Sequence, residues 1–238
     1  VIWQWTQVAS NVGCAGQDAV ANAGGDHYFV GADDLYVFDG SYPRSIGGNI
    51  KRWFFKDADP ARLKNIVAVH DRNDDHVWFW YSSKTAASGF FDTAIVYNML
   101  TGAWGRVSLV AQDVMTHQSG TDTLSVVISE SPYHRVKTLS GACATASMQT
   151  WAMGDDDQLS RLQKVRLRYL TSPSSASVTH YHKMALGLAY TAGTTDTMTD
   201  HKANFTQSAR WHKLKIDTVG AFEISGLAVT EAVQNGNK

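Results

Sequence analysis

The chain has 238 residues, a mass of 26.1 kDa and a formal net charge of −1, which is enough length for one large domain or two smaller ones to bury a core. With 44% hydrophobic and 18% charged residues, its composition excludes disorder over long stretches. The near-neutral charge also excludes a long-range attraction of the whole protein for nucleic acid.

The residue types favour strands and tight turns over helices. The chain contains 8 Trp, 9 Tyr and 9 Phe, together with 19 Gly and only 4 Pro. Residues 2–8 already alternate like a strand with one buried face. Because the chain starts within this pattern and begins with Val1, we expect a further N-terminal portion to precede it.

Two segments indicate a repeated antiparallel unit. Residues 34–40 (DLYVFDG) and 92–107 (DTAIVYNMLTGAWGRV) both run from β-branched and aromatic residues into a tight turn. In the second segment, Trp104 follows the turn at a distance that lets it fold back on the sheet. A single hairpin cannot bury its apolar face alone, so repeated copies predict four-stranded blades that stack on one another.

The pattern places one short helix among the strands of the first part of the chain. We expect this helix at residues 57–65, with Asp59 as its N-cap and Pro60 at the first helical position. Residues 141–153 are ambiguous, and a strand is favoured for their second half. Strands are predicted at residues 19–25, 26–30, 35–38, 66–69, 77–81, 113–117, 124–129 and 135–139 and in the hairpin 92–107.

From Lys164 onward the alternating strands become longer, as in a sandwich or a last blade with extended edges. The predicted fold is therefore all-β, with β-propeller-like antiparallel blades in residues 1–157 and a β-sandwich-like segment in residues 158–238 that closes or flanks the propeller. Strands are expected at residues 164–170, 176–184, 185–191, 209–218 and 222–232, and a long polar loop at 193–207.

The cysteines and the apolar runs add two negative expectations. Cys14 and Cys143 lie far apart without a C-x-x-C spacing, which indicates neither a zinc site nor a disulfide framework, so we expect two buried thiols. No apolar run approaches the ~20 residues of a membrane span, and no signal peptide opens the chain. Both observations predict synthesis in the cytoplasm without a membrane span.

A succession of short phrases resembles a known family. Together they resemble the β-propeller region of the tail nozzle, or tubular tail, proteins of short-tailed bacteriophages, a group that includes DNA stabilisation and tail accessory factors. The resemblance covers roughly three quarters of the chain, most clearly residues 11–107 and 208–229, while residues 108–157 fit it poorly. The phrases are VGC (12–14), HYFVGADDLYVFDG (27–40), PRSIGGNI (43–50), LKNIVAVHD (63–71), VWFWYSS (77–83), the hairpin 92–107 and RWHKLKIDTVGAFEISGLAV (210–229).

This resemblance implies a structural virion protein of a phage tail or head-to-tail junction. Such proteins form a ring, usually a hexamer, that retains the packaged DNA and lets it pass at ejection. The implied partners are copies of the chain, other tail and connector proteins and, transiently, the DNA genome, and the implied location is the virion tail after synthesis in the host cytoplasm. Family members that form a complete tail segment are longer than this chain.

Five basic residues are candidates for lining such a channel: Lys51, Arg52, Lys164, Arg166 and Arg168. The alternative is that they are solvated strand edges, which commonly carry Lys and Arg to block aberrant pairing. A near-neutral protein is consistent with a conduit, because phosphate contacts add up and a strongly basic lumen would hold the duplex.

Carboxylates occur as the pairs Asp33–Asp34 and Asp74–Asp75 and as the triplet at residues 155–157. Glycoside hydrolysis needs two carboxyl groups roughly 5 to 9 Å apart. All of these residues fall in predicted turns, where Asp is favoured because it bonds to its own backbone. The sequence contains no nucleophile motif such as G-x-S-x-G and no phosphate-cradling loop, so we predict no enzyme and no catalytic residues.

The nine histidines raise the possibility of a metal site. His180 and His182 fall on one face of a predicted strand, and His70 and His76 flank one acidic turn. No third ligand has a suitable spacing. Surface or interface histidines are therefore favoured, and no metal or other cofactor is predicted.

The run of Trp78, Phe79, Trp80 and Tyr81 suggests a second function, because aromatic faces on a β scaffold can stack on sugars. Alternation places the two Trp on one face and the other two rings on the opposite face, as in a strand buried between blades. Core packing is favoured. A carbohydrate-binding β-propeller for receptor recognition is the alternative function and a glycosidase the third, although Trp104 has no counterpart after residue 40.

Overall fold

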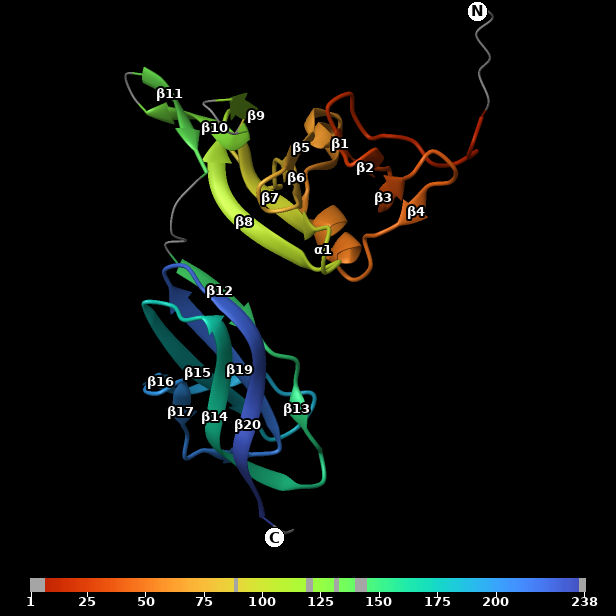
Figure 1. Ribbon diagram of the computed structural model, residues 1–238. Coiled ribbons are helices and arrows are strands. Elements are labelled where there is room, and N and C mark those ends of the chain that lie inside the picture. The colour runs from red at the N-terminus through yellow and green to blue at the C-terminus, as the bar shows by residue number, and fades with distance from the viewer. Residues whose placement is uncertain (1–6, 88–89, 119–121, 131–132, 140–144, 236–238) are drawn as a thin grey trace, which may run out of the picture. The chain divides into compact units, whose positions relative to one another are not determined.

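The structure, a computed structural model, describes residues 7–87, 90–118, 122–130, 133–139 and 145–235. The protein is all-β: antiparallel strands dominate the described residues, and the helices among them are short. Contacts divide the chain into two compact units, Val1–Ser140 and Gly141–Lys238 (Figure 1). The strand expected at residues 2–8 falls mostly on residues 1–6, outside the described part of the chain.

The first unit begins with an antiparallel meander in which each strand pairs with the next. Gly24 and Gly25 join its first two strands with φ angles of 65° and 99°, in the left-handed region that glycine adopts without strain. The strands follow the order β1 (Val20–Ala23), β2 (Asp26–Val30), β3 (Leu35–Phe38) and β4 (Arg44–Ser45).

A second meander contains the hairpin expected at residues 92–107. The side-chain oxygen of Asn98 accepts hydrogen bonds from the backbone N–H groups of Leu100 (3.0 Å) and Thr101 (2.9 Å). Gly102 follows with a φ of 67°, so the turn is made by the residue types that favour it. The strands follow the order β5 (Val67–Asp71), β6 (His76–Tyr81), β7 (Phe91–Asn98) and β8 (Trp104–Ala111).

A third meander has three strands and completes the first unit. Its first strand, β9, lies beside β5, and β5 also lies beside β1. The backbone N–H of Ala68 on β5 donates to the carbonyl of Asp18, just before β1, at 2.7 Å. The first strands of three successive meanders are therefore neighbours in space. The third meander consists of β9 (Asp113–Gln118), β10 (Asp122–Glu130) and β11 (Tyr133–Thr138).

Strand β6 separates two core clusters of the first unit. Phe79 and Tyr81 pack into the cluster that contains Leu35 of β3, whereas Trp80 packs with Val114 and other residues of β9 and β10. The expected alternation of the aromatic run is confirmed, because neighbouring side chains of a strand point to opposite faces. The aromatic run is core.

Two helices connect the first two meanders. Asp59 caps the 3-10 helix η1 (Pro60–Asn65), where its side chain accepts from Ala61 N at 3.0 Å, as the sequence predicts. The α-helix α1 (Ile50–Asp57) was not expected from the sequence. Its aromatic residues suit a strand, but Phe54 is fully buried edge-on against Tyr81, so tertiary packing outweighs local preference.

The second unit is a two-layer sandwich. One sheet has the order β12-β19-β15-β16, with β13 also paired to β19, and the other is built on the long strand β14, with β17 and β18 along one side and β20 along the other. Val165 and Leu167 of β14 face Val178, Leu214 and other residues of the first sheet in a single core cluster. The strands are β12 (Thr145–Gln149), β13 (Met153–Gly154), β14 (Leu159–Thr171), β15 (Ser175–Lys183), β16 (Thr191–Thr197), β17 (Lys202–Asn204), β18 (Ser208–Ala209), β19 (Trp211–Val219) and β20 (Glu223–Asn235).

Three sequence expectations differ from the second unit as it folds. Residues 185–190 form turns instead of the strand expected at 185–191, and the polar loop expected at 193–207 contains most of β16 and all of β17. The Thr-rich strand β16 lacks apolar alternation because it is exposed and pairs only through its backbone with β15. The unit also starts before residue 158, since β12 and β13 pair with β19.

Trp104 provides a test of how the first two meanders are joined. Its Nε1 donates to the carbonyl of Ile46 at 3.0 Å, and its ring lies 4.8 Å from that of Tyr97. We expect Trp104→Phe to lower the free energy of unfolding by about 1–2 kcal/mol, because one hydrogen bond and part of the ring contact are lost. Chemical denaturation followed by circular dichroism measures this change.

Trp151→Phe is the matched control, because Trp151 is 82% exposed. We expect it to change the stability by less than about 0.5 kcal/mol. Equal effects of the two substitutions would contradict the role assigned to Trp104.

Candidate functional site

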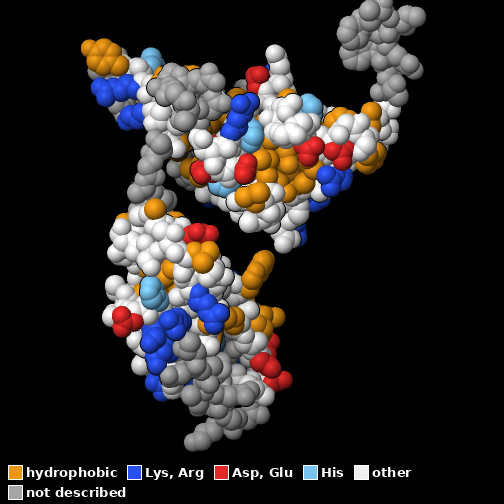
Figure 2. Space-filling model, viewed as in Figure 1, with side chains coloured by type: hydrophobic (Ala, Val, Ile, Leu, Met, Phe, Trp, Pro, Cys, Tyr) orange, Lys and Arg blue, Asp and Glu red, His pale blue; other side chains and the backbone are white. Residues whose placement is uncertain are grey.

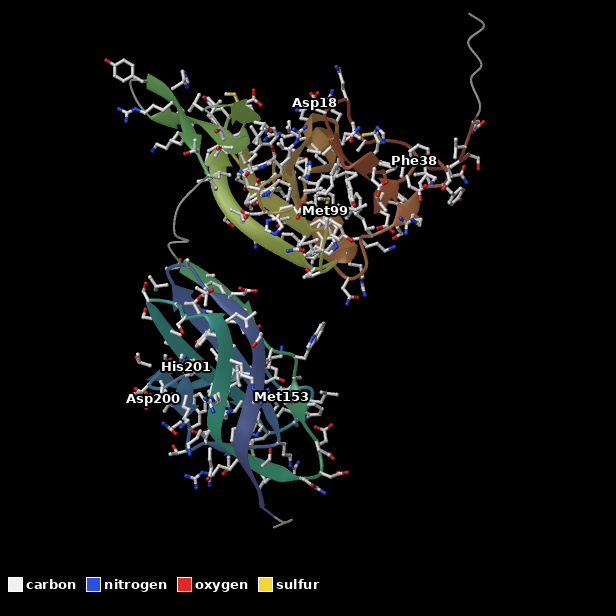
Figure 3. All side chains as sticks on the ribbon, viewed as in Figure 1. Asp18, Phe38, Met99, Met153, Asp200 and His201 are labelled. Carbon is white, nitrogen blue, oxygen red and sulfur yellow. The ribbon has the colours of Figure 1, made fainter. Side chains whose placement is uncertain are left out.

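A groove of about 850 Å³ lies in the first unit where the three meanders meet. Its walls come from the first strands β1, β5 and β9 and the residues that flank them, including Asp18 (Figure 3). No neighbouring pair of these strands is contiguous in sequence, so the fold alone brings them together. The lining residues are Gln17, Asp18, Val20, Ala21, Asn22, Val67, Ala68, Val69, His70, Arg72, Asp113, Val114 and Thr116.

Charges of both signs line this groove. Asp18 and Asp113 contribute carboxylates, and Arg72 contributes a guanidinium. Burial, together with the neighbouring Arg72, lowers the pKa of His70, which therefore is neutral at pH 7. A mixed, hydrogen-bonding lining can hold water or a hydroxyl-rich ligand, but it has no single-sign field that would hold a polyanion.

The structure separates the five basic candidates into two groups. Lys51, on α1, is used in an ion pair: its Nζ lies 2.7 Å from the buried carboxylate of Asp34. Burial by itself would raise the pKa of Asp34, but Lys51, the Ser45 hydroxyl and the backbone N–H of Leu35 together hold it below its usual value. Arg52 is exposed on the same helix.

The other three candidates, Lys164, Arg166 and Arg168, lie together on β14 in the second unit. β14 is paired on both sides: Arg166 stands opposite Lys202 of β17 and opposite Ala228 of β20. The strand-edge interpretation is therefore wrong for these residues, because β14 is a central strand.

The carboxylates form local and tertiary hydrogen bonds. Asp33 accepts from the hydroxyl of Tyr36 at 3.0 Å, and Asp155 accepts from the backbone N–H of Asp157 at 2.9 Å, which is the expected turn chemistry. Asp156 accepts from the Trp211 indole and from the backbone N–H of Leu186. In the other turn, Asp75 adopts a φ of 52°. These contacts stabilise turns and the sandwich.

Two of the histidine candidates join a residue that the sequence did not single out. His180 and His182 lie on β15 with ring centroids 5.6 Å apart, but the close partner of His180 is His212 of β19: the Nε2 of His180 lies 2.7 Å from the Nδ1 of His212. The inward alternation of His212 with Leu214 and Ile216 was the available signal. His70 and His76 do not converge; His76 Nε2 lies 3.0 Å from the Asn98 amide nitrogen.

The hydrogen bonds around His212 determine its tautomer. Its Nε2 lies 3.1 Å from the carbonyl of Ala209, which can only accept, so Nε2 carries the proton and Nδ1 accepts from His180. Ser160 Oγ lies 2.9 Å from the same Nε2. Because this nitrogen is already protonated, it cannot take a proton from Ser160, and the arrangement does not activate a nucleophile.

Burial keeps this histidine pair neutral. His180 and His212 are 0% and 1% exposed. Burial, with smaller contributions from His212 and His182, lowers the pKa of His180 to about 4, and burial also lowers the pKa of His212. Among the described residues, no group of three or more His, Cys, Asp or Glu is placed to hold a metal ion.

The remaining candidates are structural or exposed. Trp78 and Trp80 stack with centroids 5.9 Å apart, and Trp80 is fully buried, so neither ring forms an open platform for a sugar. Cys14 is exposed, which corrects the expectation of a buried thiol; it lies in a loop that no sheet covers. Cys143 lies outside the described residues.

Comparisons with known proteins do not extend this description. No protein-family model matches the chain, and no curated protein matches it. Within the described segments, no helix has the length and apolar character needed to cross a membrane.

The histidine pair predicts how the second unit responds to acid. The pKa values of His180 and His212 are lower in the folded than in the unfolded chain, so the unfolded chain binds more protons between about pH 6.5 and pH 4. We expect the free energy of unfolding to fall as the pH drops through this window, by about 3 kcal/mol for a pKa lowered from 6.5 to about 4. Hydrogen exchange of β15 and β19 peptides at several pH values measures it.

The variant His180→Gln/His212→Gln removes both titrating groups and is expected to flatten this pH dependence. His134→Gln, at an exposed position of β11, is the control and is expected to leave the dependence unchanged. If the double variant loses stability with acid as steeply as the original chain, the histidine pair is not the cause.

Proposed function

We propose that the protein is a structural component of a phage tail or head-to-tail junction, and that copies of it form a ring, hexameric in the virion, that retains packaged DNA and lets it pass at ejection. The observation that carries this proposal is the repetition of one antiparallel meander. The segments behind the family resemblance fold into β1–β4, β5–β8 and the end of the sandwich. They are thus the segments that form sheets.

The arrangement of the meanders favours propeller-like blades. In a propeller, consecutive blades place their first strands around a central channel. Here β1, β5 and β9 are neighbours and line one polar groove. This geometry supports the family resemblance, and closure into a complete propeller remains a prediction.

The edge of the third meander offers a place for a neighbouring copy. β11 is an outer strand of its sheet, and its six residues are all exposed. Tyr133 and Val136 are 65% and 53% exposed, although apolar side chains on an exposed edge promote pairing with another chain. A second copy that adds a strand here would bury them.

A carbohydrate-binding role is the second candidate, and the groove favours it. Its Asp, Asn, Gln and Thr side chains are the groups that hydrogen-bond sugar hydroxyls. The aromatic run does not support this role, because Trp80 and Phe79 are buried in the core.

Assembly in solution tests the proposed function. Light scattering on the chain over a range of protein concentrations is expected to give a mass several times 26.1 kDa, with rings visible by electron microscopy. Val136→Pro is expected to weaken assembly, because proline cannot donate to a strand ladder. Val110→Pro, at another exposed strand position, serves as the comparison.

A strictly monomeric species under all conditions would contradict the ring. If such a monomer also melted at a higher temperature in the presence of glycans, the carbohydrate-binding role would replace it, because a ligand that binds the folded state raises the melting temperature.

A further inference from the structure

The central strand β14 of the second unit carries a row of basic side chains on one face. Val165 and Leu167 point into the sandwich and are 0% and 1% exposed, so Arg166 and Arg168 point to solvent. Residues two apart on a strand stand about 6.6–6.8 Å apart. Lys164 extends the row toward the start of the strand.

The register of the sheet increases the charge of this face. Arg166 stands directly opposite Lys202 of β17, and paired residues of antiparallel strands project from the same face. Like charges in this relation destabilise a sheet. On the other side, Arg166 and Arg168 stand opposite Ala228 and Gly226, which supply no carboxylate. In the free protein this arrangement is unfavourable, and an anion bound to the face would relieve it.

Acidic residues of the second unit are engaged elsewhere. Residues 141–238 contain 10 Lys and Arg and 8 Asp and Glu, a small surplus that the fold concentrates. Asp156 bonds Trp211, Asp196 accepts from the backbone N–H of Asn204, and Asp217 pairs with Lys215 on the other sheet. Glu223 stands opposite Thr171, beyond the basic row. Figure 2 shows Lys and Arg side chains gathered on this face of the unit.

The turn before β17 adds to the same side of the sheet. Asp200 and His201 lie there, both with positive φ (Figure 3). The carbonyl of His201 accepts from the backbone N–H of Leu167 at 3.0 Å, which anchors the turn beside β14 and fixes Lys202 in register. The position of Lys202 is thus set by backbone hydrogen bonds.

We propose that this face, formed by Lys164, Arg166, Arg168 and Lys202 and hereafter called the β14 basic face, binds the phosphodiester backbone of double-stranded DNA. Guanidinium groups bind phosphate through paired hydrogen bonds. Phosphates follow each DNA strand at 3.4 Å intervals along the axis, so basic residues about 6.6–6.8 Å apart reach alternate phosphates. Gly226 and Ala228 leave the face open on one side.

The inference deepens the proposed function, because it names the surface that contacts the genome, and it rests on that function for the identity of the polyanion. Three or four phosphate contacts give weak binding that depends strongly on salt. A contact of this kind suits DNA that must be retained and later released.

Binding of a short, fluorescently labelled DNA duplex, followed by anisotropy over a series of salt concentrations, tests the proposal. We expect Arg166→Ala/Arg168→Ala to weaken binding and to reduce the slope of log K against log salt by about 2, at about 0.9 per lost phosphate contact. The matched control is Arg135→Ala/Lys137→Ala, which also removes two charges two residues apart, but from the edge strand β11. It is expected to leave the slope unchanged.

Lys202→Thr separates a binding role from a purely structural one. Relief of the like-charge pair is expected to raise the melting temperature of the free protein, while DNA binding becomes weaker. The proposal is overturned if the original chain does not bind the duplex at low salt, if both double variants weaken binding equally, or if Lys202→Thr leaves binding unchanged. Ring formation is measured separately, so its failure and a failure of DNA binding are distinguishable.

Discussion

Burial of strand β6 on both faces is the constraint on which the first unit depends. Phe79 and Tyr81 require cover on one face and Trp80 on the other, so the second meander is stable only between two apolar layers. Helix α1 and the first meander supply one layer, and β9 and β10 supply the other. This requirement brings β1, β5 and β9 together, and the polar groove follows from it.

In the second unit, the alternation of β14 produces both the core and the charged face. Each inward apolar residue of this strand is followed by an outward basic one, and the two-layer packing leaves the outer face to solvent. The neutral histidine pair shows the opposite solution: two polar rings lie inside the sandwich because each satisfies the other. Charge is therefore kept outside and hydrogen bonds inside, which makes acid a selective perturbation of this unit.

Sequence patterns predicted the fold class, most strands and the hairpin at residues 92–107, because apolar alternation and turn residues act locally. The same patterns missed α1, where Phe54 is helical for the sake of a tertiary contact, and β16, whose residues carry no apolar alternation. Of the candidate site residues, the basic run on β14 was visible in the sequence. His212 and Lys202 were not, because their roles depend on strand register.

The sequence by itself determined that the chain is β-rich, where its tight turns fall and which residues of each strand share a face. These properties depend on backbone geometry and neighbouring residues alone. The tertiary structure decided which strands pair, where one unit ends, that β14 is central and that Arg166 stands opposite Lys202. Such outcomes depend on contacts between residues far apart in the chain, and a periodic pattern carries no information about its partner.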